Sequence, residues 1–204
     1  MICSRSDGHT GPVSYDMPDG DVLLFEHLFD RAESDRLYQK LHTTIQWQQD
    51  KIELYGRTID LPRLTAWYGD PGKSYTYSGI LMRPHAWTRH LLRIKKRIEE
   101  EVEVEFSSVL LNLYRTGRDS VGWHSDNERE LGRNPVIGSV SFGETRMFQM
   151  RHLTRKKLSR VEIPLGHGSL LLMKGTTQHY WEHQVPKTAQ TVEPRINLTF
   201  RVIR

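Results

Sequence analysis

A histidine and an aspartate stand two residues apart in the segment Val121-Gly122-Trp123-His124-Ser125-Asp126. Alternate residues of an extended chain share a face and lie about 6 to 7 Å apart, so His124 and Asp126 can both reach one metal ion. A His-x-Asp pair also occurs often by chance, and its ordinary interpretation is a histidine paired with an aspartate at a strand end. The pair indicates a metal site only if a further ligand lies near it in the fold.

A second histidine, His183, ends the segment Tyr180-Trp181-Glu182-His183, 57 residues after Asp126 (183 − 126). A β-sandwich can close that separation by folding back on itself. Two histidines and one carboxylate form the facial triad of non-haem iron(II) sites, which leaves positions open for a bidentate 2-oxo acid and for dioxygen. His179, four residues before His183, competes for the same role, and spacing alone does not separate the two.

Polar and apolar residues alternate in the C-terminal segment Arg195-Ile196-Asn197-Leu198-Thr199-Phe200-Arg201-Val202. One interpretation of this period of two is an edge strand with a solvated polar face. If the apolar face packs against a sheet or helices instead, Arg195 and Arg201 point into the interior and need anionic partners. A dicarboxylate such as 2-oxoglutarate would supply them, because arginine binds carboxylates through two parallel hydrogen bonds.

Short β-rich runs separated by turn residues fill the chain from Phe106 onward. They lie at 108–114, 121–124, 136–142, 146–151, 161–163, 169–173, 179–183 and 195–203. Regularly spaced short strands are typical of a sandwich or barrel. Upstream, residues 22–25 predict a strand, Asp30 is expected to cap a helix over 31–42, and a second helix is predicted at about 84–101. The predicted fold class is α+β and mainly β: a double-stranded β-helix (jelly roll) buttressed by N-terminal helices.

The composition limits the classes of protein to which the chain can belong. With 204 residues, of which 37% are hydrophobic, it fits one structural domain, and its formal net charge of +4 mildly favours a polyanionic partner. The single cysteine, Cys3, excludes an internal disulfide framework and a cysteine-rich zinc site. No apolar run approaches the roughly 18 residues of a membrane span, and the first residues lack a signal-peptide core. We therefore expect a soluble intracellular monomer without a membrane partner, cytoplasmic if bacterial and nuclear if eukaryotic.

From roughly Asp21 to Arg204 the chain resembles the AlkB family of iron(II)- and 2-oxoglutarate-dependent dioxygenases, especially its DNA-repair members. Six segments stand in the family's order: Asn112-x-Tyr114, His124-x-Asp126, 138–143, 166–171, His183 and 195–201. The resemblance implies that iron(II) is held by His124, Asp126 and His183, which selects His183 over His179, and that dioxygen is a co-substrate. It also implies that six side chains surround 2-oxoglutarate: Asn112, Tyr114, Arg195, Asn197, Thr199 and Arg201.

The resemblance, together with composition, divides the chain into three parts. Residues 1–20, rich in Ser, Gly, Asp and Pro, are expected to form a flexible N-terminal arm. Residues 21–105 would form the nucleotide-recognition and helical support region, and residues 106–204 the catalytic jelly roll. Within the first of these regions, Tyr75, Tyr77 and Ser78 resemble the family segment that contacts a flipped base, and Tyr55 stands where relatives that repair duplexes carry a wedging hairpin. Strand packing is the alternative for the two tyrosines of the flipped-base segment.

One position departs from the repair-type pattern. Asn127 stands after the metal-binding motif where a second aspartate is usual, and Glu128 follows it. A carboxylate there would favour cationic bases, so the substitution leaves the base preference open, with both residues expected near the substrate. The densest basic segment, 151–160, is either a solvated loop or a phosphate-contacting flank of the active site.

The activity that the resemblance implies is oxidative dealkylation of N-alkylated bases in DNA, of the 1-methyladenine and 3-methylcytosine type. Formaldehyde, succinate and carbon dioxide would be released. One alternative keeps the cofactors and changes the substrate to RNA, a protein or a small molecule, because fold does not settle function. Another alternative is a non-catalytic, metal-dependent nucleic-acid-binding module.

Overall fold

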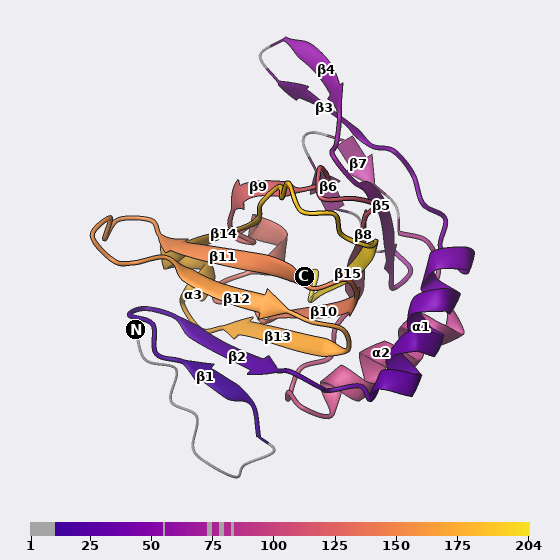
Figure 1. Cartoon of the computed structure of the whole chain (residues 1–204), viewed down its shortest axis with the longest axis horizontal. Helices are drawn as coiled ribbons and strands as arrows, with labels where there is room; N and C mark the ends of the chain where they lie inside the picture. The colour runs from indigo at the N-terminus through magenta and orange to yellow at the C-terminus, as the bar shows by residue number, and fades with distance from the viewer. Residues whose placement is uncertain (1–10, 55, 73–74, 78–79, 83) are drawn as a thin grey trace.

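Two antiparallel β-sheets face each other in the computed structural model, which describes residues 11–54, 56–72, 75–77, 80–82 and 84–204 (Figure 1). The larger sheet has the order β1 (Val13–Tyr15), β2 (Asp21–Phe25), β13 (Ser169–Lys174), β10 (Ile137–Gly143), β15 (Arg195–Arg201), β8 (Ser108–Tyr114) and β5 (Leu64–Gly69). The smaller sheet has the order β12 (Val161–Leu165), β11 (Arg146–His152), β14 (Trp181–Val185) and β9 (Val121–His124). This arrangement confirms the predicted jelly roll buttressed by helices.

The remaining elements lie outside these two sheets. Two small hairpins pair β3 (Lys51–Leu54) with β4 (Arg57–Asp60) and β6 (Tyr75–Tyr77) with β7 (Ile80–Met82). The first of them projects from the body at the top of Figure 1. The helices are α1 (Arg31–Thr44), α2 (Arg89–Glu99), the single turn α3 (Thr177–Tyr180) and a 3-10 turn at Arg129–Leu131. None of the described helices is long and apolar enough to cross a membrane.

Strand burial shows why the two sheets differ in sequence pattern. In β12, Val161, Ile163 and Leu165 face the core while the residues between them are exposed, as expected for a sheet with one wet face. In β15, by contrast, all seven residues are buried. Its apolar residues pack with α1 and α2, so its polar residues point between the sheets. The structure therefore supports the interior interpretation of the C-terminal segment and contradicts the solvated edge strand.

The two main helices cover the outer face of the larger sheet. Asp30 caps α1 as predicted, with its carboxylate accepting a hydrogen bond from the backbone N–H of Glu33 at 2.7 Å. The second helix begins at Arg89, later than the predicted start near residue 84, because Thr88 caps it and His85 is bridged to Tyr68 of β5 in an extended conformation.

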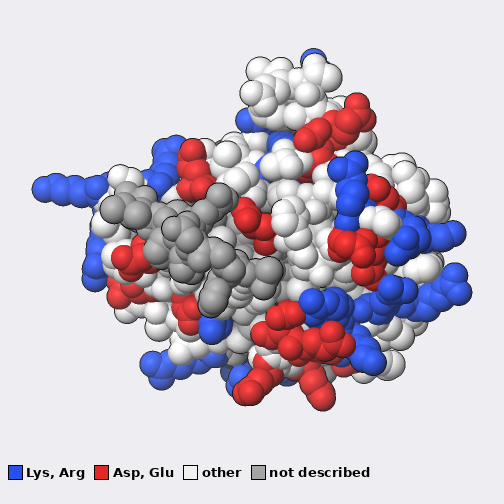
Figure 2. All heavy atoms as spheres, turned by 60° about the horizontal axis from the view of Figure 1, so that its bottom comes forward, with Lys and Arg blue, Asp and Glu red and all other residues white. Residues whose placement is uncertain are grey.

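Three basic residues of α2 are paired with acidic neighbours. Ion pairs join Arg93 to Glu33 of α1, Lys95 to Glu99, and Arg97 to Glu101. Figure 2 shows Lys and Arg side chains lying beside Asp and Glu side chains on the face that it displays. The structure thus favours a solvated, charge-balanced helix face over a nucleic-acid groove on α2.

The structure differs from the predicted local structure, or adds to it, at three places. Residues 11–20, the described part of the predicted arm, pack on the body of the protein: β1 pairs with β2, and Met17 is buried in the core. The strand expected at 179–183 begins only at Trp181, because α3 takes up 177–180. Finally, β5 was not predicted, since its residues from Thr65 to Gly69 are buried on both faces and show no alternation.

Candidate metal centre and anion-binding cavity

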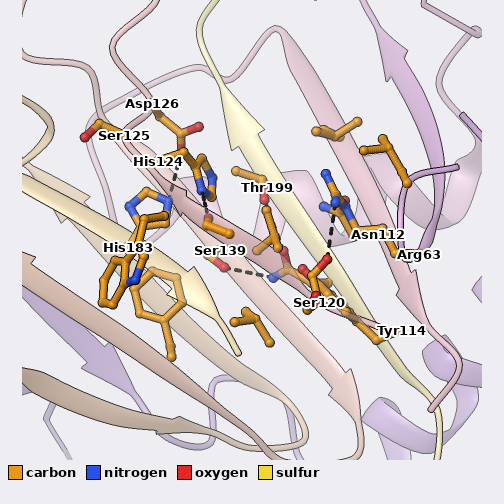
Figure 3. A pocket seen from close by; sticks show the side chains of 18 of the residues that line it. Arg63, Asn112, Tyr114, Ser120, His124, Ser125, Asp126, Ser139, His183 and Thr199 are labelled. Atoms are coloured by element: carbon orange, nitrogen blue, oxygen red, sulfur yellow. Dashed lines mark hydrogen bonds and ion pairs between the residues drawn. The ribbon is translucent and has the colours of Figure 1, made fainter. Parts of the chain in front are cut away.

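His124, Asp126 and His183 meet at one end of a cavity between the sheets (Figure 3). His124 of β9 is the direct cross-strand neighbour of His183 of β14, and their ring centroids lie 4.3 Å apart. Asp126 follows two residues after the end of β9, with Oδ2 3.8 Å from Nε2 of His183. One ligand atom from each of the three residues lies within 4.8 Å of the others. The predicted ligand set is therefore brought together by strand pairing.

The protonation states of these groups suit metal binding. Burial lowers the pKa of His183 to about 3, so its imidazole is neutral at physiological pH. Burial by itself would raise the pKa of Asp126, but the adjacent charge of Arg201 and the hydrogen bond from its guanidinium hold the pKa below its ordinary value. Nδ1 of His124 lies 2.8 Å from the carbonyl oxygen of Gly122 and donates to it, so Nε2 is the ring nitrogen that remains to bind a metal ion. Two imidazoles and a carboxylate that converge in this way are suited to bind a divalent metal ion.

His179 is not part of this cluster. Its Nε2 lies 2.9 Å from Oδ1 of Asn134, shortly after the 3-10 turn, and its side chain is exposed. The metal-ligand cluster found in the described part of the chain consists of His124, Asp126 and His183 alone. The structure therefore agrees with the choice of His183.

Arg195 lies at the other end of the cavity and is almost completely buried. Its Nη2 donates to the hydroxyl of Ser141 at 2.9 Å, and its guanidinium lies 5.2 Å from the ring centre of Tyr114. Nε and Nη1 have no hydrogen-bond partner among the described residues. Burial lowers the pKa of Arg195 to about 10, so the group keeps its charge at neutral pH. A buried cation with two guanidinium nitrogens that lack a partner is suited to bind an anion.

Arg201 differs from Arg195, because it already has an anionic partner inside the protein. Its Nη2 donates to Oδ1 of Asp126 at 2.5 Å. The sequence suggested that both guanidiniums would need an anion from outside. In the structure, the requirement for an external anion falls on Arg195, while Arg201 neutralises the buried carboxylate of the metal-ligand cluster.

The cavity between these two ends measures about 350 Å³. It is lined by all nine residues predicted for metal and diacid: Asn112, Tyr114, His124, Asp126, His183, Arg195, Asn197, Thr199 and Arg201. A polar ladder runs along it, in which Asn197 Nδ2 donates to the hydroxyl of Ser139 at 2.8 Å and Thr199 donates to Oδ1 of Asn197 at 3.1 Å. The cavity is thus wide enough, and polar enough along one wall, for a small dicarboxylate.

Sequence reasoning missed Arg63, which is buried at the cavity wall. Its Nε donates to Oδ1 of Asn112 at 2.7 Å, and its Nη1 donates to the carbonyl of Ser120 at 3.3 Å (Figure 3). The first bond fixes which end of the Asn112 amide faces the cavity. No local signal marks Arg63, because its importance comes from the pairing of the unpredicted β5 with β8.

The predicted base-contacting residues have different positions. Glu128 lines the cavity, and its Oε2 is buried without a hydrogen-bond partner in the described structure. Asn127, by contrast, is exposed and is not among the lining residues. Tyr75 and Tyr77 lie in β6, but their side chains lie outside the described residues, as do Tyr55 and Ser78 altogether. Of these candidates, Glu128 is the one that the structure directs toward the cavity.

Comparison with known proteins points to one family of oxygenases. The family model of the 2OG-Fe(II) oxygenase superfamily matches residues 21–201. The alpha-ketoglutarate-dependent dioxygenase alkB homolog 3 of Bos taurus is 46% identical over 190 residues, which cover 89% of this chain and 66% of the relative. The DNA oxidative demethylase ALKBH2 of Mus musculus is 38% identical over 185 residues, covering 86% of this chain and 77% of the relative. This chain therefore spans slightly less than two thirds of the first relative's length and more of the second.

A solved structure shares the fold. The protein described as "The structure of OsALKBH1" superimposes with a TM-score of 0.64 at 16% sequence identity, covering 92% of this chain and 98% of that chain. At this identity the likeness concerns the fold alone. Taken with the family model, the mouse relative and the His-Asp-His cluster, it leads to one conclusion: the chain belongs to the AlkB family within the 2OG-Fe(II) oxygenase superfamily.

Proposed function

We propose that the protein is an iron(II)- and 2-oxoglutarate-dependent dioxygenase that removes N-linked alkyl groups from bases of DNA. The observation that carries the proposal is a single cavity with a His-Asp-His cluster at one end and a buried, incompletely bonded arginine at the other. For an N-methyl base the balanced reaction consumes dioxygen and 2-oxoglutarate. It yields the unmodified base, formaldehyde, succinate and carbon dioxide.

The residues at the two ends of the cavity bind different groups, a metal ion at one end and a carboxylate at the other. His124, Asp126 and His183 would hold iron(II), which supplies the oxidising power of the reaction through dioxygen and the 2-oxo acid. Arg195 binds the distal carboxylate of 2-oxoglutarate, while Tyr114 and Ser141 hold its guanidinium in place. Arg201 keeps Asp126 ionised and therefore available as a ligand. Asn112, Asn197 and Thr199 give the cavity wall its hydrogen-bonding pattern.

Glu128 supports a base with a positive charge or an exocyclic amine as substrate. A buried carboxylate oxygen without a partner is costly, and a donor from a bound base would satisfy it. 1-Methyladenine and 3-methylcytosine provide both the charge and the N–H groups. The mouse relative named DNA oxidative demethylase supports DNA as the substrate.

The loop between β11 and β12 supports contact with the phosphate backbone. It projects from the smaller sheet at the left of Figure 1 and exposes Arg155, Lys156 and Lys157. Arg155 is held by Asp19 at 3.1 Å, which leaves the two lysines as the cations that we assign to phosphates.

Anaerobic reconstitution with iron(II) and 2-oxoglutarate, followed by oxygen and a methylated oligonucleotide, tests the proposal by mass spectrometry. We expect the oligonucleotide to lose one methylene unit, with one succinate formed for each event. Asp126→Ala should abolish this loss, whereas His179→Ala, which removes a histidine outside the cluster, should retain it. Wild-type protein that binds metal and 2-oxoglutarate but leaves every methylated base intact would refute dealkylation of nucleic acid.

A further inference from the structure

Gln178 is a buried polar residue for which the proposed function gives no role. It lies in α3, the single helical turn that leads from β13 into β14, and its side chain is completely buried. A buried amide is retained only where its hydrogen bonds compensate for the loss of water. The partners of Gln178 therefore indicate what it does.

Both ends of the Gln178 amide are bonded. Oε1 accepts a hydrogen bond from the backbone N–H of Asp126 at 2.9 Å, and Nε2 donates to the sulfur of Met173 at 3.5 Å. Nearby, the hydroxyl of Ser125 donates to the carbonyl of Trp181 at 2.9 Å. Two hydrogen bonds thus tie residues 125–126 to the segment that enters β14.

Asp126 depends on such hydrogen bonds because it lies beyond the end of β9. The ladder between β9 and β14 pairs His124 with His183 and Val121 with Val185, and it is irregular between these pairs. Since β9 ends at His124, the ladder fixes the two histidines but not the aspartate. The side chain of Asp126 is held by Arg201, and its main chain is held by Gln178.

We infer that Gln178 is a positioning residue for the metal centre: through its hydrogen bond to the Asp126 main chain, it sets this ligand relative to the strand that carries His183. The inference rests on the proposed function, in that it assumes a divalent metal at the His-Asp-His cluster. Residues that orient metal ligands typically change metal affinity by about 10- to 100-fold when removed. A residue that only fills space would not have this effect if its volume were kept.

Two variants separate hydrogen bonding from packing. Gln178→Met keeps the length and approximate volume of the side chain but cannot accept from the Asp126 N–H. Gln178→Glu keeps an acceptor oxygen. The matched control is Thr177→Val, a buried neighbour in α3 whose hydroxyl bonds to Asp21 and Lys174 and not to the metal-ligand segment. It perturbs the same turn without touching Asp126.

Cobalt(II), added anaerobically to the full chain, gives a readout independent of turnover. We expect Gln178→Met to raise the Kd for cobalt(II) by about 10-fold or more and to shift its d–d absorption bands, which report ligand geometry. Gln178→Glu should restore a Kd and a spectrum close to those of the wild type. Thr177→Val should lower the Tm while leaving both cobalt readouts at their wild-type values.

Three results would overturn the inference. The first is a wild-type Kd and spectrum in Gln178→Met, and the second is equal weakening of cobalt binding by Thr177→Val. The third is a failure of Gln178→Glu to recover binding. If the wild-type protein itself bound no cobalt(II), both this inference and the proposed metal centre would be wrong. If the wild type bound cobalt(II) and Gln178→Met did so equally well, the proposed function would stand and the inference alone would fall.

Discussion

Replacing Arg195 by methionine should stabilise the protein without ligands and abolish its binding of 2-oxoglutarate. In the structure without a ligand, Arg195 is a buried cation whose Nε and Nη1 have no partner among the described residues. Methionine has a similar length, carries no charge and can pack against Tyr114. The same substitution removes the group that we assign to the distal carboxylate.

The magnitude follows from the cost of burying the charge. Burial lowers the pKa of Arg195 well below its ordinary value, to about 10, which means that the folded protein disfavours the charged form. At about 1.4 kcal/mol for each tenfold change in proton affinity, the cost is on the order of 3 kcal/mol. The bond to Ser141 offsets part of it, so we expect the unfolding free energy of ligand-free Arg195→Met to rise by about 1 to 3 kcal/mol.

Urea denaturation with and without 2-oxoglutarate, in the presence of cobalt(II), measures both effects. The diacid should stabilise the wild type according to its Kd and should leave Arg195→Met unchanged. Arg195→Lys is the control for charge alone, because it keeps a cation but loses the two-bond contact. The reasoning fails if ligand-free Arg195→Met is less stable than the wild type, or if 2-oxoglutarate stabilises it as strongly.

Three further predictions concern the substrate side and the fold. Glu128→Gln should lower kcat/KM for 1-methyladenine by about 10-fold relative to a neutral ethenoadenine lesion, because it removes the charge and keeps the shape; an unchanged ratio would remove Glu128 from base recognition. Reversing the charges of Lys156 and Lys157 should reduce the slope of log K against log salt for DNA binding by about 1.5. An unaltered slope would mean that this loop does not contact phosphates. Burial lowers the pKa of His167, whose Nδ1 accepts from the N–H of Gly143 at 2.8 Å, so its contribution to stability is full above the unfolded value of 6.5 and is lost as the pH falls from there through the lower folded pKa. His167→Asn, which keeps an acceptor but does not titrate, should therefore lose less unfolding free energy between pH 7.5 and 5.5 than the wild type; equal losses would contradict this assignment.

The sequence predicted those parts of the site that local periodicity encodes. Alternation along 195–201 placed Arg195 and Arg201 on one face of their strand without deciding between solvent and interior, and the spacing of His124 and Asp126 placed both on one side of the chain. The same reasoning could not predict that Arg201 binds Asp126, because these residues are 75 positions apart and meet only after the two sheets have closed.

Residues whose role depends on pairing between distant elements were missed for the same reason. Arg63 reaches Asn112 only because β5 joins the edge of the larger sheet, and β5 has no alternation to reveal it. The sequence did not single out Gln178, because it predicted a strand at 179–183 where the structure has the helical turn α3. The side chain of Gln178 is buried in that turn. Burial on both faces removes the polar-apolar contrast on which strand prediction depends.

The direct pairing of His124 with His183 across β9 and β14 has a consequence for metal selectivity. Strand pairing fixes the main chains of the two histidines. The ring of His124 is oriented by its hydrogen bond to Gly122 and that of His183 by stacking on Phe148, so both rings are placed without the help of a metal ion. Affinity should then follow the Irving–Williams series, in which nickel(II) and copper(II) exceed iron(II). Occupancy by iron would therefore be decided by which ions the cell keeps available, and excess nickel would abolish the proposed dioxygenase activity by simple displacement.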